Sequence, residues 1–269
     1  MIERLKDLWA HRELLWNMTV KELKVKYKRS VLGFAWSFMT PLVMLLVFSI
    51  VFSILARGGD VQWYAVFLMS GLLPWLFFVN SLMQSVGSIV ANPGLVKKVY
   101  FPREILPIAA VGANIFHFVL QMLVFFVFML LIRWHFSPWL LLMPFILILQ
   151  VVLTLGLALL VSAANVYLRD VQHFVEVALT ALFWLSPIVY PVGLVASQFP
   201  KFMPLYLVNP MTNIVLLWEY AIYNPHHYGP QVAYISFWGI LITVVFSIVT
   251  LVGGYYVFAR IERGFAEQI

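Results

Sequence analysis

The sequence contains no cysteine and few charged residues. With no cysteine in 269 residues, the chain cannot form a disulfide, a thiolate metal site or a cysteine nucleophile. Charged residues make up 10 % of the sequence and apolar residues 63 %, with a mean hydropathy of +0.95. Soluble domains are about half apolar and about a quarter charged. The composition therefore predicts an integral membrane protein, and about six spans of about 20 residues each leave no room for a separate soluble domain.

The sequence also lacks the motifs of several enzyme and nucleotide-binding classes. It has no phosphate-binding loop of the form Gly-x-x-x-x-Gly-Lys-Ser/Thr, so we expect the chain not to hold ATP itself. It has neither a Gly-x-Ser-x-Gly elbow nor a His-Glu-x-x-His motif. His226 and His227 are adjacent, and adjacent residues place two rings on one metal ion less readily than an i, i+4 pair does. We therefore predict no catalytic residue and no metal site.

The N-terminus does not have the pattern of a cleavable signal peptide, because its first thirty residues are charged throughout and lack an apolar core. No internal repeat is found, so the inverted-repeat design of many secondary transporters has no support. Basic residues that orient a membrane protein account for most of the formal charge of +6. Nucleic-acid binding is therefore not expected.

Long apolar segments predict an all-α membrane protein with six transmembrane helices. The expected spans are residues 32–55, 64–90, 108–132, 140–166, a fifth that begins near residue 174, and a last at 233–258. If both termini lie on one side, 14 of the 17 lysine and arginine residues lie there too, and only Arg57, Arg133 and Lys201 lie on the other side. The positive-inside rule then places both termini in the cytoplasm.

Between the last two spans, the chain is interrupted by prolines. Pro187 and Pro191 end the fifth span. The apolar run 211–222 is too short to cross a membrane and carries Glu219, and Asn209-Pro210 has the pattern of a helix start. Residues 192–230 are therefore predicted to form two short re-entrant helices.

Residues 1–31 are basic, and their pattern favours a helix that lies in the headgroup region of the membrane. A simple positive anchor is a compatible interpretation. On a helical wheel one broad face carries Leu5, Leu8, Trp9, Leu15, Trp16, Val20, Leu23 and Tyr27, opposite Lys21 and Lys28.

Residues 92–107 form a polar island between two apolar spans, with prolines at both ends. At helical spacing, Leu95 pairs with Val99 and Val96 with Tyr100. The pattern is typical of a short amphipathic helix on the inner membrane surface that presents a face to a partner. A basic turn that only fixes orientation is the alternative.

Polar residues inside the spans are few, and hydrogen bonds between helices explain them as well as a transport path does. They are His117, Gln121, Gln150 and Asn165. Glu176 is expected to pair or to reach the membrane interface. Proton-coupled transport usually needs a carboxylate deep in the membrane, and the predicted spans place none there.

Aromatic residues make up 17 % of the sequence, more than interfacial belts require. Belt anchoring and packing explain many of them. The functional alternative is a passage for sugars, whose apolar ring faces stack on aromatic planes. The candidates for such a path are Trp36, Phe78, Phe183, Trp184 and Tyr190.

Several stretches together resemble the type-2 ABC exporter permeases, in particular the polysaccharide-export branch. They occur in the family's order and cover nearly the whole chain. Residues 94–107 are the most specific part of the resemblance. The stretches are 24–33 (KVKYKRSVLG) followed by Trp36 and Pro41, 71–75 (GLLPW), 94–107 (GLVKKVYFPREILP), 165–170 (NVYLRD), 186–191 (SPIVYP) and Asn209-Pro210.

The resemblance implies a half-transporter in the bacterial cytoplasmic membrane. Two permeases would pair side by side, and two copies of a separate ATPase, which binds ATP and Mg, would dock beneath them. The permease itself would hold no cofactor. Residues 1–31 would be the interface helix and 32–269 a single permease domain, with 92–107 as its coupling loop and 192–230 as its periplasmic gate helices.

The resemblance also assigns roles within the coupling loop. An apolar face would fit a cleft of the ATPase, surrounded by a polar rim, and closure of the ATPase dimer would open a path for a lipid-linked polysaccharide such as O-antigen. The residues concerned are Leu95, Val96, Val99 and Tyr100 on the face, and Lys97, Lys98, Arg103 and Glu104 on the rim.

Three other functions fit parts of the sequence. A drug or lipid exporter could use the same fold, but the aromatic content and residues 100–107 are closer to the polysaccharide branch. A membrane-embedded transferase would need an acid–base constellation, and only Asp170 with His173 comes close, where a salt-bridged turn is the simpler account. A channel would work without an ATPase.

Overall fold

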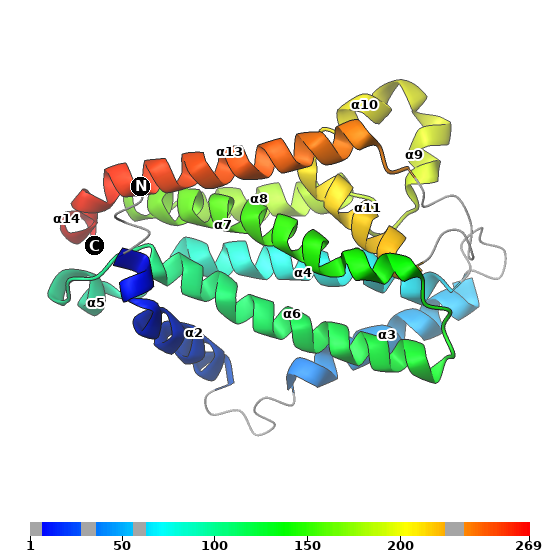
Figure 1. Ribbon diagram of the computed structural model, residues 1–269, viewed down its shortest axis with the longest axis horizontal. Coiled ribbons are helices and arrows are strands. Elements are labelled where there is room, and N and C mark those ends of the chain that lie inside the picture. Colours follow the sequence, from blue (N-terminus) through cyan, green and yellow to red (C-terminus); the bar gives the residue numbers. More distant parts are fainter. Residues whose placement is uncertain (1–6, 28–35, 56–62, 224–233) are drawn as a thin grey trace.

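The structure is a computed structural model that describes residues 7–27, 36–55, 63–223 and 234–269. Within these ranges the regular elements are all helical (Figure 1). The elements that build the bundle are α2 (Arg12–Tyr27), α3 (Trp36–Leu55), α4 (Tyr64–Gly87), α5 (Pro93–Lys98), α6 (Ile105–Leu131), η2 (Pro138–Leu142), α7 (Met143–Tyr167), α8 (Val171–Trp184), α9 (Val192–Gln198), η3 (Pro200–Phe202), α10 (Met203–Tyr206), α11 (Pro210–Tyr223), α13 (Phe237–Ile261), η5 (Glu262–Gly264) and α14 (Phe265–Gln268).

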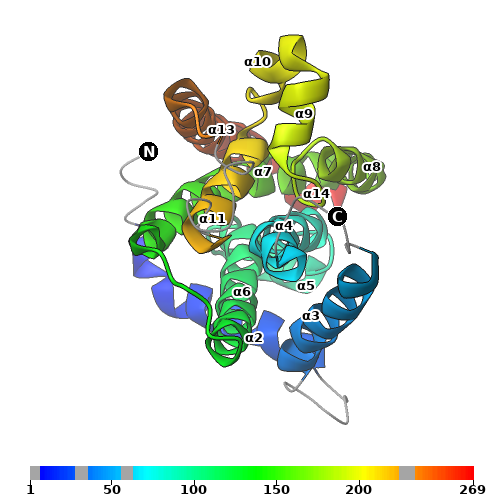
Figure 2. The same ribbon diagram turned by 90° about the vertical axis from the view of Figure 1, so that its right-hand side faces the viewer.

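Helix α4 is the centre of the bundle. Figure 2, which looks along the bundle, shows it enclosed by α3, α6, α7, α8 and α11. It is apolar around its whole circumference, and 78 % of its most apolar stretch is buried, compared with 17 % for α13. A helix that is hydrophobic on all sides belongs in a core, whereas α13 turns most of its surface outward.

Four helices among the described residues are long and apolar enough to cross a membrane. They are α4, α6, η2 with α7, and α13 with η5. They coincide with four of the six predicted spans, shifted by no more than six residues at either end. Helix α3 is 20 residues long and α8 only 14. At about 1.5 Å per residue, α8 is shorter than a bilayer core.

Helices α7 and α13 cross with their backbones in contact. A Cβ atom at Gly156 would overlap the backbone of Thr250 and Leu251, and one at Gly254 would overlap the Gly156 carbonyl oxygen. Small residues allow this approach where helices meet in a membrane. This crossing holds α13, which is otherwise the most exposed of the long helices, against the bundle.

Gln150 of α7 joins three helices in the core. Its side chain is completely buried, donates to the carbonyl oxygen of Pro74 in α4 at 2.7 Å, and accepts a 2.8 Å hydrogen bond from Trp218 Nε1 in α11. Asn165 donates to the Val86 carbonyl oxygen at 3.0 Å. Hydrogen bonds between helices, one of the two interpretations of such residues, are thus present at these two positions.

Between α8 and α13, α9 and α10 project at one end of the bundle, and α11 returns into its interior (Figure 1). The predicted helix start is confirmed, because α11 begins at Pro210 and the Asn209 Oδ1 accepts a 3.0 Å hydrogen bond from the Met211 N–H. His226 and His227 lie outside the described residues, as do residues 28–35 of the N-terminal segment and first span.

Helix α2 lies across the bundle beneath α6 (Figure 2). Its predicted apolar face divides between two environments. Leu8 and Leu15 pack against a buried group of apolar side chains, called the second hydrophobic cluster below, while Trp9 and Trp16 remain exposed. The cluster consists of Ile89, Val96, Phe101, Ile105, Leu106, Leu159, Ala163, Val166, Phe258 and Phe265. Thr19, at 5 % exposure, is the residue buried most deeply against α6, where Gly112 leaves room for it.

Candidate functional site

The candidate site is the segment that joins α4 to α6. Its helix, α5, covers only Pro93–Lys98, with proline at the first turn. Val99 is extended, with φ −123° and ψ 134°, and Pro102 follows. The expected helical pairing of Leu95 with Val99 and of Val96 with Tyr100 is therefore wrong, because the helix ends before Val99.

The apolar side of α5 faces the protein itself. Val96 is 3 % exposed and packs in the second hydrophobic cluster with Phe101 and Ile105, and Leu95 packs at its edge. The surface left open consists of Lys97, Lys98, Val99 and Tyr100, and the Tyr100 side chain is 94 % exposed. A large aromatic side chain held in water beside two lysines is typical of a contact with a partner.

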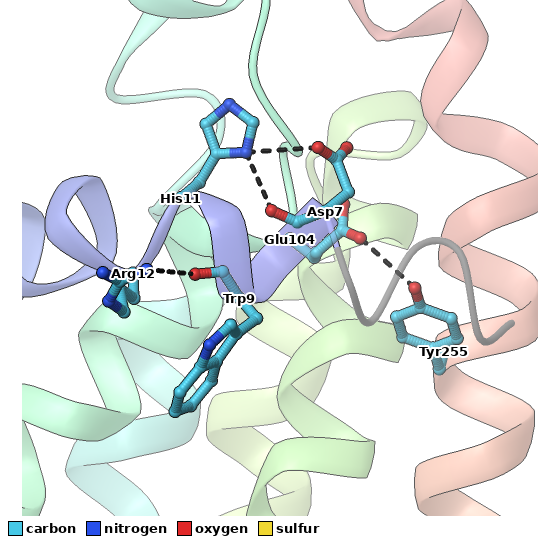
Figure 3. A network of polar contacts seen from close by, with 6 residues as sticks. All are labelled: Asp7, Trp9, His11, Arg12, Glu104 and Tyr255. Carbon is cyan, nitrogen blue, oxygen red and sulfur yellow. Dashed lines mark hydrogen bonds and ion pairs between the residues drawn. The ribbon is translucent and has the colours of Figure 1, made fainter.

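Two residues expected on the polar rim point inward. Glu104 is 2 % exposed, and its Oε1 accepts a 3.4 Å hydrogen bond from the Tyr255 hydroxyl of α13 (Figure 3). Arg103 donates to the Glu262 carbonyl oxygen. Since Glu104 is buried, it cannot belong to an exposed rim. The sequence spacing cannot reveal this, because both partners lie more than 150 residues away.

A chain of polar contacts joins the same segment to α2. Lys21 donates to Asn92 Oδ1 at 2.7 Å, and Gln84 donates to Glu22 Oε2 at 2.8 Å. Asn114 of α6 then donates to Gln84 Oε1 at 2.7 Å. These bonds join α2, the end of α4 and the start of α5 into one unit.

The aromatic candidates for a substrate path do not share one environment. Phe78 is 2 % exposed and its ring contacts that of Trp75 at a tilt of 51°. Trp75 also contacts Phe183, and Phe183 contacts Trp184. Trp184 is 63 % exposed. The structure thus joins Phe78, Phe183 and Trp184 in one aromatic row.

The two remaining path candidates lie elsewhere. The Tyr190 hydroxyl donates to the Trp184 carbonyl oxygen at 2.7 Å and lies 3.2 Å from the Tyr206 hydroxyl, in the turn between α8 and α9. Trp36 begins α3 and is 48 % exposed. A role for all five residues in transport stays a prediction.

The sequence did not predict that the Glu219 carboxyl is completely buried. It places this carboxyl in a short helix outside the spans, whereas the structure buries it completely, with no hydrogen-bond partner for either oxygen among the described residues. A Cβ atom at Gly71 of α4 would lie 3.0 Å from Glu219 Oε1. Because desolvation penalises the charged form, burial raises the pKa of the Glu219 carboxyl well above its usual value.

We expect Glu219→Gln to raise stability at alkaline pH. A carboxyl whose folded-state pKa is raised binds a proton more tightly in the folded state, so stability falls as pH rises above the unfolded pKa of about 4.3. Melting temperatures in detergent at pH 5 and pH 8 measure this, and the glutamine variant should lose the pH-dependent decrease. Glu176→Gln, at an exposed position, is the control. An unchanged pH dependence in Glu219→Gln would contradict the assignment.

The described residues contain no group of three or more His, Asp or Glu side chains able to hold a metal ion. His173 lies 3.9 Å from Glu176, and both side chains are largely exposed. The acid–base pairing of Asp170 with His173 that a transferase would require is therefore replaced by a surface contact within α8.

Comparison with known proteins adds independent information. The family described as ABC-2 type transporter matches residues 13–223. An O-antigen export system permease protein RfbA from Klebsiella pneumoniae is 31 % identical over 258 residues, covering 95 % of this chain and 94 % of the relative. A protein of the same name from Myxococcus xanthus is 30 % identical, and both chains are fully covered.

A more distant relative is the polysialic acid transport protein KpsM from Escherichia coli, which is 24 % identical over 209 residues and covers 76 % of this chain and 78 % of the relative. The family match spans more than half of the sequence, and it includes the central helix α4, the exposed segment after α5 and the returning helix α11. The chain therefore belongs to the ABC-2 type transporter family.

Proposed function

We propose that this protein is the transmembrane subunit of an ATP-driven exporter that moves a lipid-linked polysaccharide, such as O-antigen, across the bacterial cytoplasmic membrane. The observation that carries the proposal is similarity over nearly the full length to O-antigen export permeases. The chain is a transport permease and not an enzyme. ATP hydrolysis, with its ATP and Mg, belongs to a separate ATPase subunit.

The proposed topology has six spans and both termini in the cytoplasm. Four candidate spans and the 20-residue α3 supply five. Helix α8, extended by residues 185–191, supplies the sixth, and α9 to α11 are the re-entrant gate helices on the outer side. Support for the shared side of the termini comes from one cavity, which is lined both by Asp7 and by Glu262 and Arg263.

The proposed docking site for the ATPase is the exposed surface of Lys97, Lys98, Val99 and Tyr100, with α2 as the interface helix beside it. Two ATPase copies would dock on two permeases. Large apolar side chains exposed on α3 and α8, such as Leu46 and Phe174, offer surface for membrane lipid and for the second permease. Closure of the ATPase dimer would move the α5 segment and, through it, α4 and α6.

The proposed cargo path follows the aromatic row of Phe78, Phe183 and Trp184 toward Tyr190 at the outer turn. Sugar rings stack on aromatic planes with little dependence on the particular sugar. Such a path would let a long polymer pass in steps without a strong binding site.

Depletion of the protein tests the proposed function. We expect lipid-linked polysaccharide to accumulate inside the cell while the cell surface loses it, as measured by extraction and chemical analysis of both pools. If both pools stay unchanged, the polysaccharide assignment fails, and a drug or lipid exporter of the same fold becomes the leading explanation. Transferase activity of the purified chain alone would favour the membrane-embedded enzyme instead.

Tyr100→Ala tests the docking site. Aromatic hot spots contribute about 2 kcal/mol or more to an interface, so we expect about 30-fold weaker binding of the ATPase. The fold should not change, because the side chain is almost fully exposed. Phe202→Ala removes an exposed aromatic residue at the opposite end of the molecule and should leave binding unchanged. Copurification at increasing salt measures the difference, and equal binding by both variants would refute the docking site.

A further inference from the structure

The C-terminal tail, residues 262–269, packs against the segment that carries α5. Phe265 is completely buried in the second hydrophobic cluster, together with Val96 of α5 and Phe101. Its ring meets Phe258 edge-on at 5.4 Å between centroids. A short helix of four residues, α14, thus places one aromatic ring under the inner side of residues 93–104, which carry the proposed docking surface and are called the docking segment below.

Arg103 also contacts this tail. Its guanidinium donates to the Glu262 carbonyl oxygen and lies over the Phe265 ring, 6.0 Å from the centroid. The planar guanidinium is suited to both contacts at once, whereas a lysine ammonium has neither the fork nor the flat face. This one side chain therefore fixes the distance between the chain after α5 and the end of the protein.

The tail is itself anchored to α7. The Tyr167 hydroxyl donates to the Ile261 carbonyl oxygen at 2.8 Å, and the Tyr167 ring lies 6.1 Å from that of Phe265. Gly264 passes so close to the Tyr167 hydroxyl that a Cβ atom there would overlap it. The tail thus connects the docking segment to the end of a long helix of the bundle.

The docking segment is not packed on every side. It lines a cavity of about 370 Å³ together with Asp7 and the first residues of the tail. In Figure 3, Glu104 reaches the Tyr255 hydroxyl of α13. The cavity is lined by Asp7, residues 99–104, Glu262 and Arg263. Because the cavity leaves the segment partly unpacked, the contact of Arg103 with the tail supports it on this side, while Asn92 holds its start to α2.

We propose that the C-terminal tail is a positioning element for the docking segment, in which Arg103 and Phe265 hold residues 97–100 rigidly on the bundle so that movement of a partner bound there reaches the spans. The proposal rests on the proposed function, since it assumes that residues 97–100 receive the ATPase. Without the tail, the segment could tilt into the cavity, and the movement of the partner would be absorbed locally.

The first test needs no partner. Because the chain has no cysteine, Lys98→Cys provides a unique site for a thiol-reactive spin label on the exposed side of α5. In lipid nanodiscs, we expect Phe265→Ala to increase the mobility of this label. Glu267→Ala, at an exposed position of the same tail, is the matched control and should leave mobility unchanged. Unchanged mobility in Phe265→Ala would overturn the proposal.

The second test uses the complex with the ATPase that copurifies with the wild-type chain. We expect Phe265→Ala to bind this ATPase and to hydrolyse ATP at the wild-type rate, while polysaccharide export per ATP falls roughly 2- to 30-fold, the range for changes along a coupling contact. Arg103→Lys should cause a smaller decrease. A purely structural role would lower export only in proportion to the amount of complex, and that result would also overturn the proposal.

If Phe265→Ala does not accumulate, Phe265→Leu keeps the apolar bulk and removes only the ring under Arg103, and the same two measurements apply. The failures are distinguishable. A wild-type chain that binds no ATPase and exports no polysaccharide refutes the proposed function. A wild-type chain that does both, with label mobility and export per ATP unchanged in the tail variants, refutes only the positioning role.

Discussion

Gly254→Val should separate α13 from the bundle. Any side chain at this position overlaps the carbonyl oxygen of Gly156, and the neighbour is backbone, which cannot move aside as a flexible side chain can. We expect a destabilisation of about 3 kcal/mol or more, at the upper end of the range for overpacked sites. The melting temperature in detergent and the yield of monodisperse protein measure this effect.

Gly253→Val is the matched control. Gly253 precedes Gly254 in the same helix, but it is exposed, and nothing lies within 4 Å of a Cβ atom built there. Glycine is a poor helix former, so the control should be as stable as the wild type or slightly more stable. Equal losses in the two variants would mean that helix propensity, and not the crossing with α7, determines the result.

Gln150→Leu should have the second largest effect. The substitution keeps the size of the side chain but removes the partner of two buried groups, the Pro74 carbonyl oxygen and the Trp218 indole N–H. Each buried group left without a partner costs about 1–3 kcal/mol, so we expect a loss of about 2–4 kcal/mol in the free energy of unfolding. Thermal unfolding in detergent, followed by circular dichroism, measures this loss.

Gln121→Leu makes the same chemical change on α6 at a half-buried position. It should lower the free energy of unfolding much less than Gln150→Leu does. Trp218→Phe removes only the indole N–H donor, and its loss in the free energy of unfolding should lie between those of Gln121→Leu and Gln150→Leu. If Gln150→Leu is as stable as the wild type, the three-helix junction of α4, α7 and α11 does not depend on this side chain.

Some of these features were accessible from the sequence and others were not. The apolar segments, the start of α11 at Pro210 and the interruption of α8 before Pro187 follow from patterns of neighbouring residues. For interior glutamine and asparagine, the sequence left two interpretations open, and it identified none of their hydrogen-bond partners. A hydrogen bond from Gln150 to Pro74 joins positions that no local pattern relates.

The docking segment was likewise predictable from the sequence only in part. Its place between two spans, its prolines and its lysines are visible in the sequence. Which side chains it exposes is not visible, because helical spacing predicts a continuous face from Leu95 to Tyr100 while the chain leaves the helix at Val99. Val96 turns inward because Phe101, Ile105 and Phe265 bury it, and Phe265 lies at the far end of the sequence.

The sequence by itself therefore determined the membrane class, the approximate helices and the family, since these depend on composition, on short-range periodicity and on motifs in a fixed order. Only the tertiary structure decided that Glu104 and Glu219 are buried, that Gly254 meets Gly156, and that the C-terminal tail supports α5. Each of these depends on the contact of segments far apart in the chain, and burial is set by what those segments cover.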